Sequence, residues 1–148
     1  MSDIVIRPVA AQERAQWEPL WLGYLAFYEK TVPQAATDFT WQRLIDPKDS
    51  IEGLIAWDAG QALGLVQYLH HPSTWSVGGN VYLQDLFVLP EARGKRIGRR
   101  LIAAVTEASR AKGAAVLYWQ TEEFNGTARR LYERVAKRAP FVRYNIEL

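Results

Sequence analysis

The chain contains no cysteine, and only two histidines occur among its 148 residues. Without cysteine there can be no disulfide bond, no thiolate metal site and no cysteine nucleophile. The two histidines, His70 and His71, are adjacent, and no further ligands stand at a spacing suited to a metal site. We therefore expect no metal.

Long apolar runs are also missing. No stretch approaches the roughly 18 residues of a membrane span, and the first ten residues, MSDIVIRPVA, show no basic segment followed by an apolar core. The expectation is a cytoplasmic protein that forms one domain over residues 1–148 and makes no contact with a membrane.

The net charge of +2 is small, but its distribution is uneven. Residues 91–100, EARGKRIGRR, hold five basic side chains and one acidic one, so the rest of the chain is mildly acidic. A localised basic turn indicates a compact anionic ligand rather than a nucleic-acid surface. The sequence also lacks the interleaved aromatic and basic residues that single-strand binders use, so no nucleic-acid partner is expected.

Apolar spacing predicts the secondary structure. The expected strands are 3–8, 52–57, 62–70, 81–89, 115–120 and 141–146, and the expected helices are 11–30, 36–45, 97–112 and 125–137. Pro19 should kink or divide the first helix, and Gly113 should end the third. Strands come first and strand–helix alternation later, which predicts an α/β (mixed α+β) fold with helices on both faces of a mixed sheet.

The basic turn lies where a helix is expected to begin. Unsatisfied backbone N–H groups and the positive end of the helix dipole attract phosphate there. Gly94 and Gly98 would let the backbone approach closely. The turn matches neither a P-loop nor the G-x-G-x-x-G dinucleotide fingerprint.

The turn resembles motif A of the GNAT superfamily of N-acetyltransferases, R/Q-x-x-G-x-G/A after an apolar strand. In LFVLPEARGKRIGRRL, Arg93 opens the motif, Arg96 replaces its inner glycine and Gly98 closes it. A second segment, NGTARRLYERV, is similar to the family pattern N-x-x-A-x-x-L/F-Y-E, with Asn125 first and Tyr132 at the tyrosine. The resemblance implies a GNAT-like sheet of about six to seven strands.

The resemblance also implies that acetyl coenzyme A is the cofactor. Its pyrophosphate would lie on the basic turn, its pantetheine arm would pair with the strand before the turn, and Asn125 would help to hold that arm. Tyr132 would be the general acid that protonates the departing thiolate. The other implied cofactor-binding residues are Leu86, Phe87, Val88, Arg93, Gly94, Lys95, Arg96, Ile97, Gly98 and Arg99.

The attacking amine must lose a proton, so a base or a water relay is needed. Polyamine-acetylating relatives carry Glu where this chain has Gln84, which cannot act as a base but can orient a water or the amine. Gln84 and Asp85 are therefore further catalytic candidates. The base itself stays open between Asp85, Glu29, Glu122 and His70.

By resemblance, the first helices and the loop between the third and fourth strands form the acceptor pocket. Aromatic faces and carboxylates suit a cationic amine. The candidate substrate-binding residues are Tyr24, Tyr28, Glu29, Trp75 and Trp119. The similarity extends to the branch of yeast-type histone and polyamine acetyltransferases and their bacterial relatives, so a diamine, an amino acid or a similar small primary amine is the favoured acceptor.

Two alternatives remain open. One is acetylation of lysine in a protein or peptide, and the other is a non-catalytic acyl-coenzyme A sensor, for which Gln84 and Arg96 are the supporting departures from the family pattern. We also expect a homodimer, because six tryptophans exceed the obvious needs of so small a core.

Overall fold

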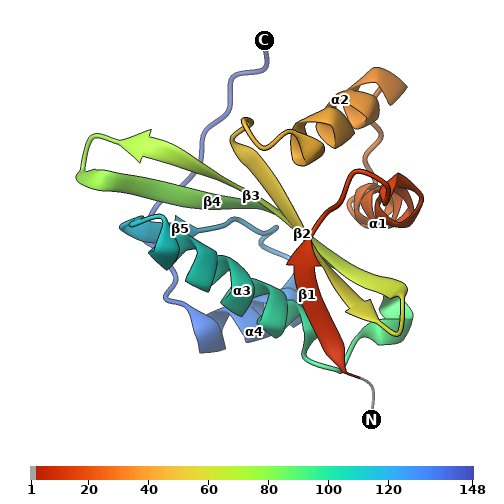
Figure 1. Cartoon of the computed structure of the whole chain (residues 1–148). Helices are drawn as coiled ribbons and strands as arrows, with labels where there is room; N and C mark the ends of the chain where they lie inside the picture. The colour runs from red at the N-terminus through yellow and green to blue at the C-terminus, as the bar shows by residue number, and fades with distance from the viewer. Residues whose placement is uncertain (1–2) are drawn as a thin grey trace.

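The computed structural model describes residues 3–148. Strands and helices follow one another in the order shown in Figure 1. They are β1 (Ile4–Pro8), α1 (Arg14–Phe27), α2 (Gln34–Ile45), β2 (Ile51–Asp58), β3 (Gln61–Ser73), β4 (Ser76–Val88), the 3-10 turn η1 (Pro90–Ala92), α3 (Ile97–Ala111), β5 (Val116–Tyr118) and α4 (Gly126–Val135).

The strands form one mixed sheet in the order β1-β2-β3-β4-β5. The first four are antiparallel neighbours, and β5 is parallel to β4 because α3 carries the chain back between them. The mixed sheet is confirmed, but among residues 3–148 it has five strands rather than six or seven.

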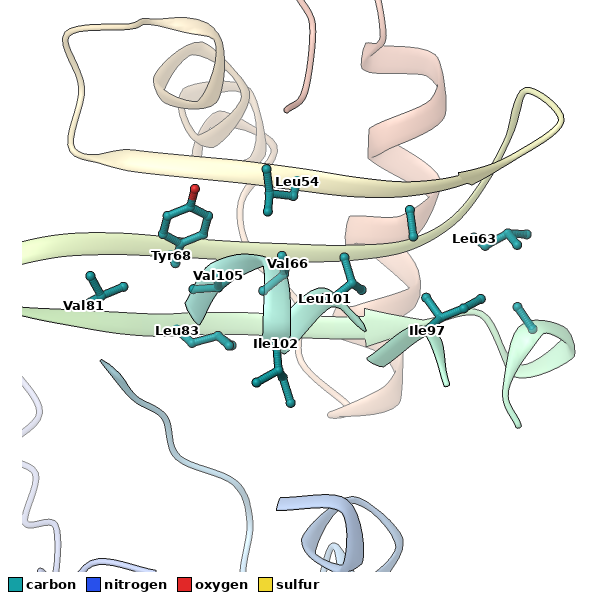
Figure 2. Packing of buried hydrophobic residues seen from close by; sticks show 12 residues of the cluster. Leu54, Leu63, Val66, Tyr68, Val81, Leu83, Ile97, Leu101, Ile102 and Val105 are labelled. Atoms are coloured by element: carbon teal, nitrogen blue, oxygen red, sulfur yellow. The ribbon is translucent and has the colours of Figure 1, made fainter. Parts of the chain in front are cut away.

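Helices cover both faces of the sheet, as expected. On one face α3 contributes Ile97, Leu101, Ile102 and Val105 to a cluster with side chains of β2, β3 and β4 (Figure 2). These positions are three or four residues apart and form the apolar stripe of a helix. On the other face α1 and α2 supply an aromatic cluster that includes Trp17 and Trp41.

The first helix differs from its prediction in two details, and the end of the third agrees. The first helix is shorter than predicted and continues through Pro19 as one element, so it is not divided. The end of α3 agrees with the sequence, since the chain turns at Gly113 with φ 75°. That conformation favours glycine because it has no Cβ.

Two expected strand features were wrong. The segment between 70 and 81 is not a loop, because β3 and β4 extend into it and form a long hairpin that turns around Trp75. Residues 141–146 do not form a strand and are exposed, because no strand among residues 3–148 pairs with them. Among residues 3–148, no helix combines the length and the apolar character that a membrane crossing requires.

Candidate active site

β4 and β5 separate soon after they meet. They pair only at Asn80–Tyr82 with Val116–Tyr118, whereas β4 continues to Val88. Within the described residues, β4 therefore has no strand partner on this edge from Leu83 onward. A free strand edge presents N–H and C=O groups to which an extended ligand can add like another strand. The predicted cofactor-binding segment Leu86–Val88 lies on this edge, and the Phe87 side chain is buried beneath it in the aromatic cluster.

A β-bulge at Gln84 lies where the two strands diverge. Asp85 is opposite Gln67 and Leu83 is opposite Tyr68, so Gln84 has no partner on β3. The extra residue changes which side chains face α3: Val81 and Leu83 do so before the bulge, and Leu86 and Val88 after it. As a result the Gln84 side chain is exposed at the split, whereas Asp85 points into the α1 face.

Asp85 belongs to a buried chain of hydrogen bonds. Trp17 Nε1 donates to Gln67 Oε1 at 2.8 Å, and Gln67 Nε2 donates to Asp85 Oδ2 at 2.7 Å. The Tyr24 hydroxyl also donates to Asp85. No ion pair within residues 3–148 includes this carboxylate, which is only 7% exposed.

Burial raises the pKa values of two side chains in this cluster, Asp85 and Tyr24. It raises the pKa of Asp85, although the hydrogen bonds from Gln67 and Tyr24 oppose the rise. Burial also raises the pKa of Tyr24, and the negative charge of Asp85 adds to that effect. Tyr24 therefore remains a hydrogen-bond donor at neutral pH.

Tyr132 lies on α4 with its ring 5.5 Å from that of Trp119 in an edge-to-face contact. Burial, with a smaller contribution from Tyr28, raises its pKa to about 12. Tyr28 in turn lies 5.0 Å from Tyr24, measured between ring centroids. The end of α1 and the helix α4 thus bring four of the predicted site aromatics together.

Two cations of the basic turn are already engaged by the protein. Arg93 Nε donates to the Val88 carbonyl at 3.2 Å, and its guanidinium lies over the rings of Phe27 and Phe87. Arg100 Nη2 donates to the Ile4 carbonyl at 2.8 Å. Arg93 therefore links the turn to β4, and it is also a predicted cofactor ligand.

Other cations of the turn are free to bind an anion. Lys95, Arg96 and Arg99 are exposed and form no ion pair within the described part of the chain. They surround the N-terminus of α3, where no side chain caps the first turn. Its backbone N–H groups therefore remain available to phosphate.

The backbone of the turn is also unusual. Gly94 has φ 86°, and Arg96, the N-cap of α3, has φ 60°, a left-handed conformation that costs a non-glycine residue about 1 kcal/mol or more. Arg96 therefore keeps the backbone shape expected of the glycine that it replaces.

At Gly98 an added Cβ would meet only ordinary contacts, 3.7 Å from Leu131 and 3.9 Å from Val88. The packing of the protein itself does not require glycine at that position.

Asn125 has a structural role in addition to its predicted one. Its side chain caps α4 by accepting a 3.4 Å hydrogen bond from Ala128 N, and its amide donates to Thr121 Oγ1 at 3.2 Å. The cap fixes the start of the helix that carries Tyr132.

Several predicted residues lie outside this group. Trp75 lies at the hairpin tip, where it is 86% exposed. It is nine residues away from Gln84, and an extended strand of that length spans about 30 Å. Glu29 and Glu122 are exposed. His70 Nε2 lies 2.6 Å from the Gly78 carbonyl, and His71 Nε2 lies 2.7 Å from the Tyr118 hydroxyl. No group of three or more possible metal ligands occurs among residues 3–148.

A comparison with protein families identifies the family. The model of the acetyltransferase (GNAT) family matches residues 15–136, which include all but the first residue of α1, the bulge, the basic turn and α4. The chain belongs to the GNAT family of acetyltransferases.

Two curated relatives match this GNAT chain along most of their length. It is 34% identical to the D-amino-acid N-acetyltransferase HPA3 of Saccharomyces cerevisiae over 143 residues, covering 95% of this chain and 89% of the relative. It is 36% identical to the uncharacterized N-acetyltransferase YhfO of Bacillus subtilis over 130 residues, covering 87% and 86%. The structure of AAC(6')-Iy with a coenzyme A bisubstrate analog has the same fold, with a TM-score of 0.80, 22% identity and coverage of 98% and 100%.

The sequence did not reveal every residue of this candidate site. Gln67 lies in an apolar strand, and nothing in its spacing marks it as the partner of Asp85. Tyr82 and Tyr118 stack at 4.9 Å beside the split, at the last paired positions of β4 and β5. A polar residue within an otherwise buried strand was the one available signal for Gln67, because buried polar groups require partners.

Proposed function

We propose that the protein transfers an acetyl group from acetyl coenzyme A to the primary amine of a small molecule, an amino acid or a diamine. Tyr132 is the general acid in this proposal. One observation carries it: the split between β4 and β5 opens with the basic turn at one end of the free edge, and the half-buried Tyr132 lies on α4, the helix that follows β5.

The described residues suit the cofactor. The uncapped start of α3, with Lys95, Arg96 and Arg99, would hold the pyrophosphate, and the free edge of Leu86–Val88 would pair with the pantetheine arm. Because Gly98 has no side chain, the ligand could approach the helix backbone closely there. When bound, acetyl coenzyme A supplies the acetyl group as a thioester.

Tyr132 supplies the proton in this proposal. Because its pKa is raised to about 12, its hydroxyl is protonated throughout the neutral range. Such a donor contributes most when it is held close to the thiolate that it protonates. The contact with Trp119 and the cap by Asn125 hold Tyr132 in place.

Asp85 is the proposed base and the proposed source of negative charge for the amine. Of the four candidates it is the buried carboxylate, and Gln67 and Tyr24 fix its orientation. A raised pKa improves a carboxylate as a proton acceptor. Gln84, exposed at the bulge, would orient the amine or a water through its side-chain amide.

The aromatic residues around Asp85 favour a small cationic acceptor. Tyr24, near the end of α1, lies beside Asp85, and the Tyr28 ring lies 5.0 Å from the Tyr24 ring, so a cation would meet ring faces and a carboxylate together. The names of the relatives agree with small acceptors, since HPA3 is a D-amino-acid N-acetyltransferase and the AAC(6')-Iy ligand is an acetylneamine analog.

The decisive experiment is thiol release from acetyl coenzyme A with a panel of D- and L-amino acids, diamines and lysine peptides. Amine-dependent release on the small molecules would support the proposal. Turnover on the peptides alone would instead identify a peptide lysine acetyltransferase. Tight coenzyme A binding without turnover on any amine would favour the sensor, and no binding would overturn the assignment of the basic turn.

A further inference from the structure

The buried hydrogen bonds at Asp85 begin at a tryptophan on α1. Trp17 Nε1 donates to Gln67 Oε1 at 2.8 Å, and Gln67 Nε2 donates to Asp85 Oδ2 at 2.7 Å. The exposed fractions of the three side chains are 0% for Trp17, 2% for Gln67 and 7% for Asp85. Because water hardly reaches these groups, each polar atom depends on the partner that the protein supplies.

The direction of these hydrogen bonds is fixed at the Trp17 end. An indole N–H group can only donate, so the Gln67 atom that faces it must be the carbonyl oxygen. The NH2 group of Gln67 then faces Asp85, and this donor suits an ionised carboxylate, which can only accept. A protonated Asp85 would have to donate its proton elsewhere, because the Gln67 carbonyl is already bound to Trp17. The arrangement therefore favours the ionised form of Asp85.

The same helix supplies a second donor to this carboxylate. Tyr24 lies seven residues after Trp17 on α1, which is roughly two helical turns, so the two side chains lie on one side of the helix. The Tyr24 hydroxyl donates to Asp85 directly. Trp17 acts at one remove, through Gln67, which lies opposite Asp85 in the β3–β4 register. One face of α1 thus directs two hydrogen bonds toward Asp85.

These donors oppose the effect of burial on Asp85. Burial raises its pKa, and the hydrogen bonds from Gln67 and Tyr24 act in the opposite direction. Two titratable groups face the carboxylate, Tyr24 on α1 and Tyr82 on β4, and burial together with the charge of Asp85 raises the pKa of each. Both are therefore neutral at pH 7, and no cation within residues 3–148 pairs with Asp85. Its ionised form depends on neutral hydrogen-bond donors.

We propose that Trp17 is a positioning residue for acetyl transfer: its indole N–H holds the Gln67 amide with the NH2 group toward Asp85, so that Asp85 is ionised when the amine arrives. This inference rests on the proposed function of Asp85 as the base. In that step the amine nitrogen keeps the electron pair of its N–H bond, and the proton passes to a carboxylate oxygen of Asp85. Without the indole N–H, the Gln67 amide can turn its oxygen toward Asp85 and bind the protonated acid instead.

Trp21 provides a matched control for Trp17. It lies on the same helix and in the same aromatic cluster, but its Nε1 donates to Thr37 Oγ1 at 3.1 Å. Trp17→Phe and Trp21→Phe each keep a ring in the core and remove one indole hydrogen bond, so both should lower the melting temperature. Only Trp17→Phe should change the protonation of Asp85.

Carbon-13 NMR of the aspartate carboxyl groups measures that protonation directly, and Asp85→Asn assigns the signal. We expect the Asp85 midpoint to rise by about one pH unit in Trp17→Phe, because the carboxylate loses a fixed hydrogen-bond donor. It should not move in Trp21→Phe. The acid limb of kcat/KM, measured by thiol release, should move with the NMR midpoint.

Gln67→Met tests the route of the effect, because methionine keeps the length of the side chain without an amide. It should raise the Asp85 midpoint, and adding Trp17→Phe to it should raise the midpoint no further. A further rise in the double variant would mean that Trp17 does not act through Gln67, and would overturn the proposal.

A measurement on the unsubstituted protein covers the case in which Trp17→Phe does not fold. The indole N–H proton signal of Trp17 should shift through the Asp85 midpoint, since Gln67 alone separates the two groups. The Trp21 signal should not follow it. A Trp17 signal that is constant through the Asp85 midpoint would overturn the proposal.

The outcomes separate this inference from the proposed function. An unchanged Asp85 midpoint in Trp17→Phe, or equal shifts in Trp17→Phe and Trp21→Phe, would overturn the role of Trp17 and leave Asp85 as the proposed base. A shifted midpoint that the rate profile does not follow would show that Asp85 is not the base, and would overturn both. A midpoint and an acid limb that move together in Trp17→Phe alone would support both.

Discussion

Gln67 donates a 2.7 Å hydrogen bond to Asp85 across the β3–β4 pair, at the position where the Gln84 bulge turns Asp85 toward α1. The bond holds a carboxylate with raised pKa where water hardly reaches it. A buried charge without an ion partner lowers stability. Its presence beside the split between β4 and β5 is therefore better explained by function than by folding.

Asp85→Asn should reduce activity and raise stability. A carboxyl whose pKa is raised on folding favours the folded state only while it is protonated, so this contribution is present below its ordinary value of 3.8 and is lost as the pH rises through the raised value. We expect kcat/KM to fall by about 10²-fold or more and the melting temperature to rise at pH 7 but not at pH 3.5.

Asp49→Asn is the matched control for that variant. The Ile51 N–H and the Arg43 guanidinium lower the pKa of Asp49, so its stabilising effect is present at neutral pH and is lost as the pH falls. This control should lose stability at pH 7 and keep its activity. Unchanged kcat/KM in Asp85→Asn would remove Asp85 from the mechanism.

Tyr132→Phe should lower kcat by about 10²-fold, because it removes one general acid and leaves the ring against Trp119. Tyr68→Phe is the matched control, since burial also raises the pKa of Tyr68 to about 12 although it lies in the cluster under α3. Rates are measured from pH 6 to 10 by thiol release. A wild-type alkaline loss of kcat centred near pH 8 that disappears in Tyr132→Phe would contradict a Tyr132 pKa of about 12.

The sequence predicted elements whose signals are local. The spacing of Ile97, Leu101 and Val105 marked α3, and the glycines and cations before Ile97 marked the basic turn. The Gln84 bulge could not be predicted in this way, because it exists only in the register between β3 and β4. The strand expected at 141–146 has a genuine strand pattern, but a strand needs a partner and none of the strands within residues 3–148 pairs with it.

Gly98→Ala should affect stability and binding in opposite directions. Alanine is favoured over glycine within a helix by about 1 kcal/mol, and the new Cβ would meet only ordinary contacts in the protein. We expect unfolding in urea to require more free energy, by up to about 1 kcal/mol, while calorimetry shows coenzyme A binding weakened at least tenfold. A variant that gains stability and binds coenzyme A normally would show that the ligand does not approach this residue.

Arg99 and Arg100 are neighbours with different partners, which makes them a matched pair. Arg99 is exposed without an ion-pair partner in residues 3–148, whereas Arg100 binds the Ile4 carbonyl. A hydrogen bond to a charged group contributes roughly 1.5 kcal/mol or more, so Arg99→Gln should weaken coenzyme A binding about tenfold and reduce its dependence on salt. Arg100→Gln should leave binding nearly unchanged and lower the melting temperature, because it frees the edge of β1. Equal losses of affinity in the two variants would mean that the turn acts only through its total charge, and that the phosphate does not sit at the start of α3.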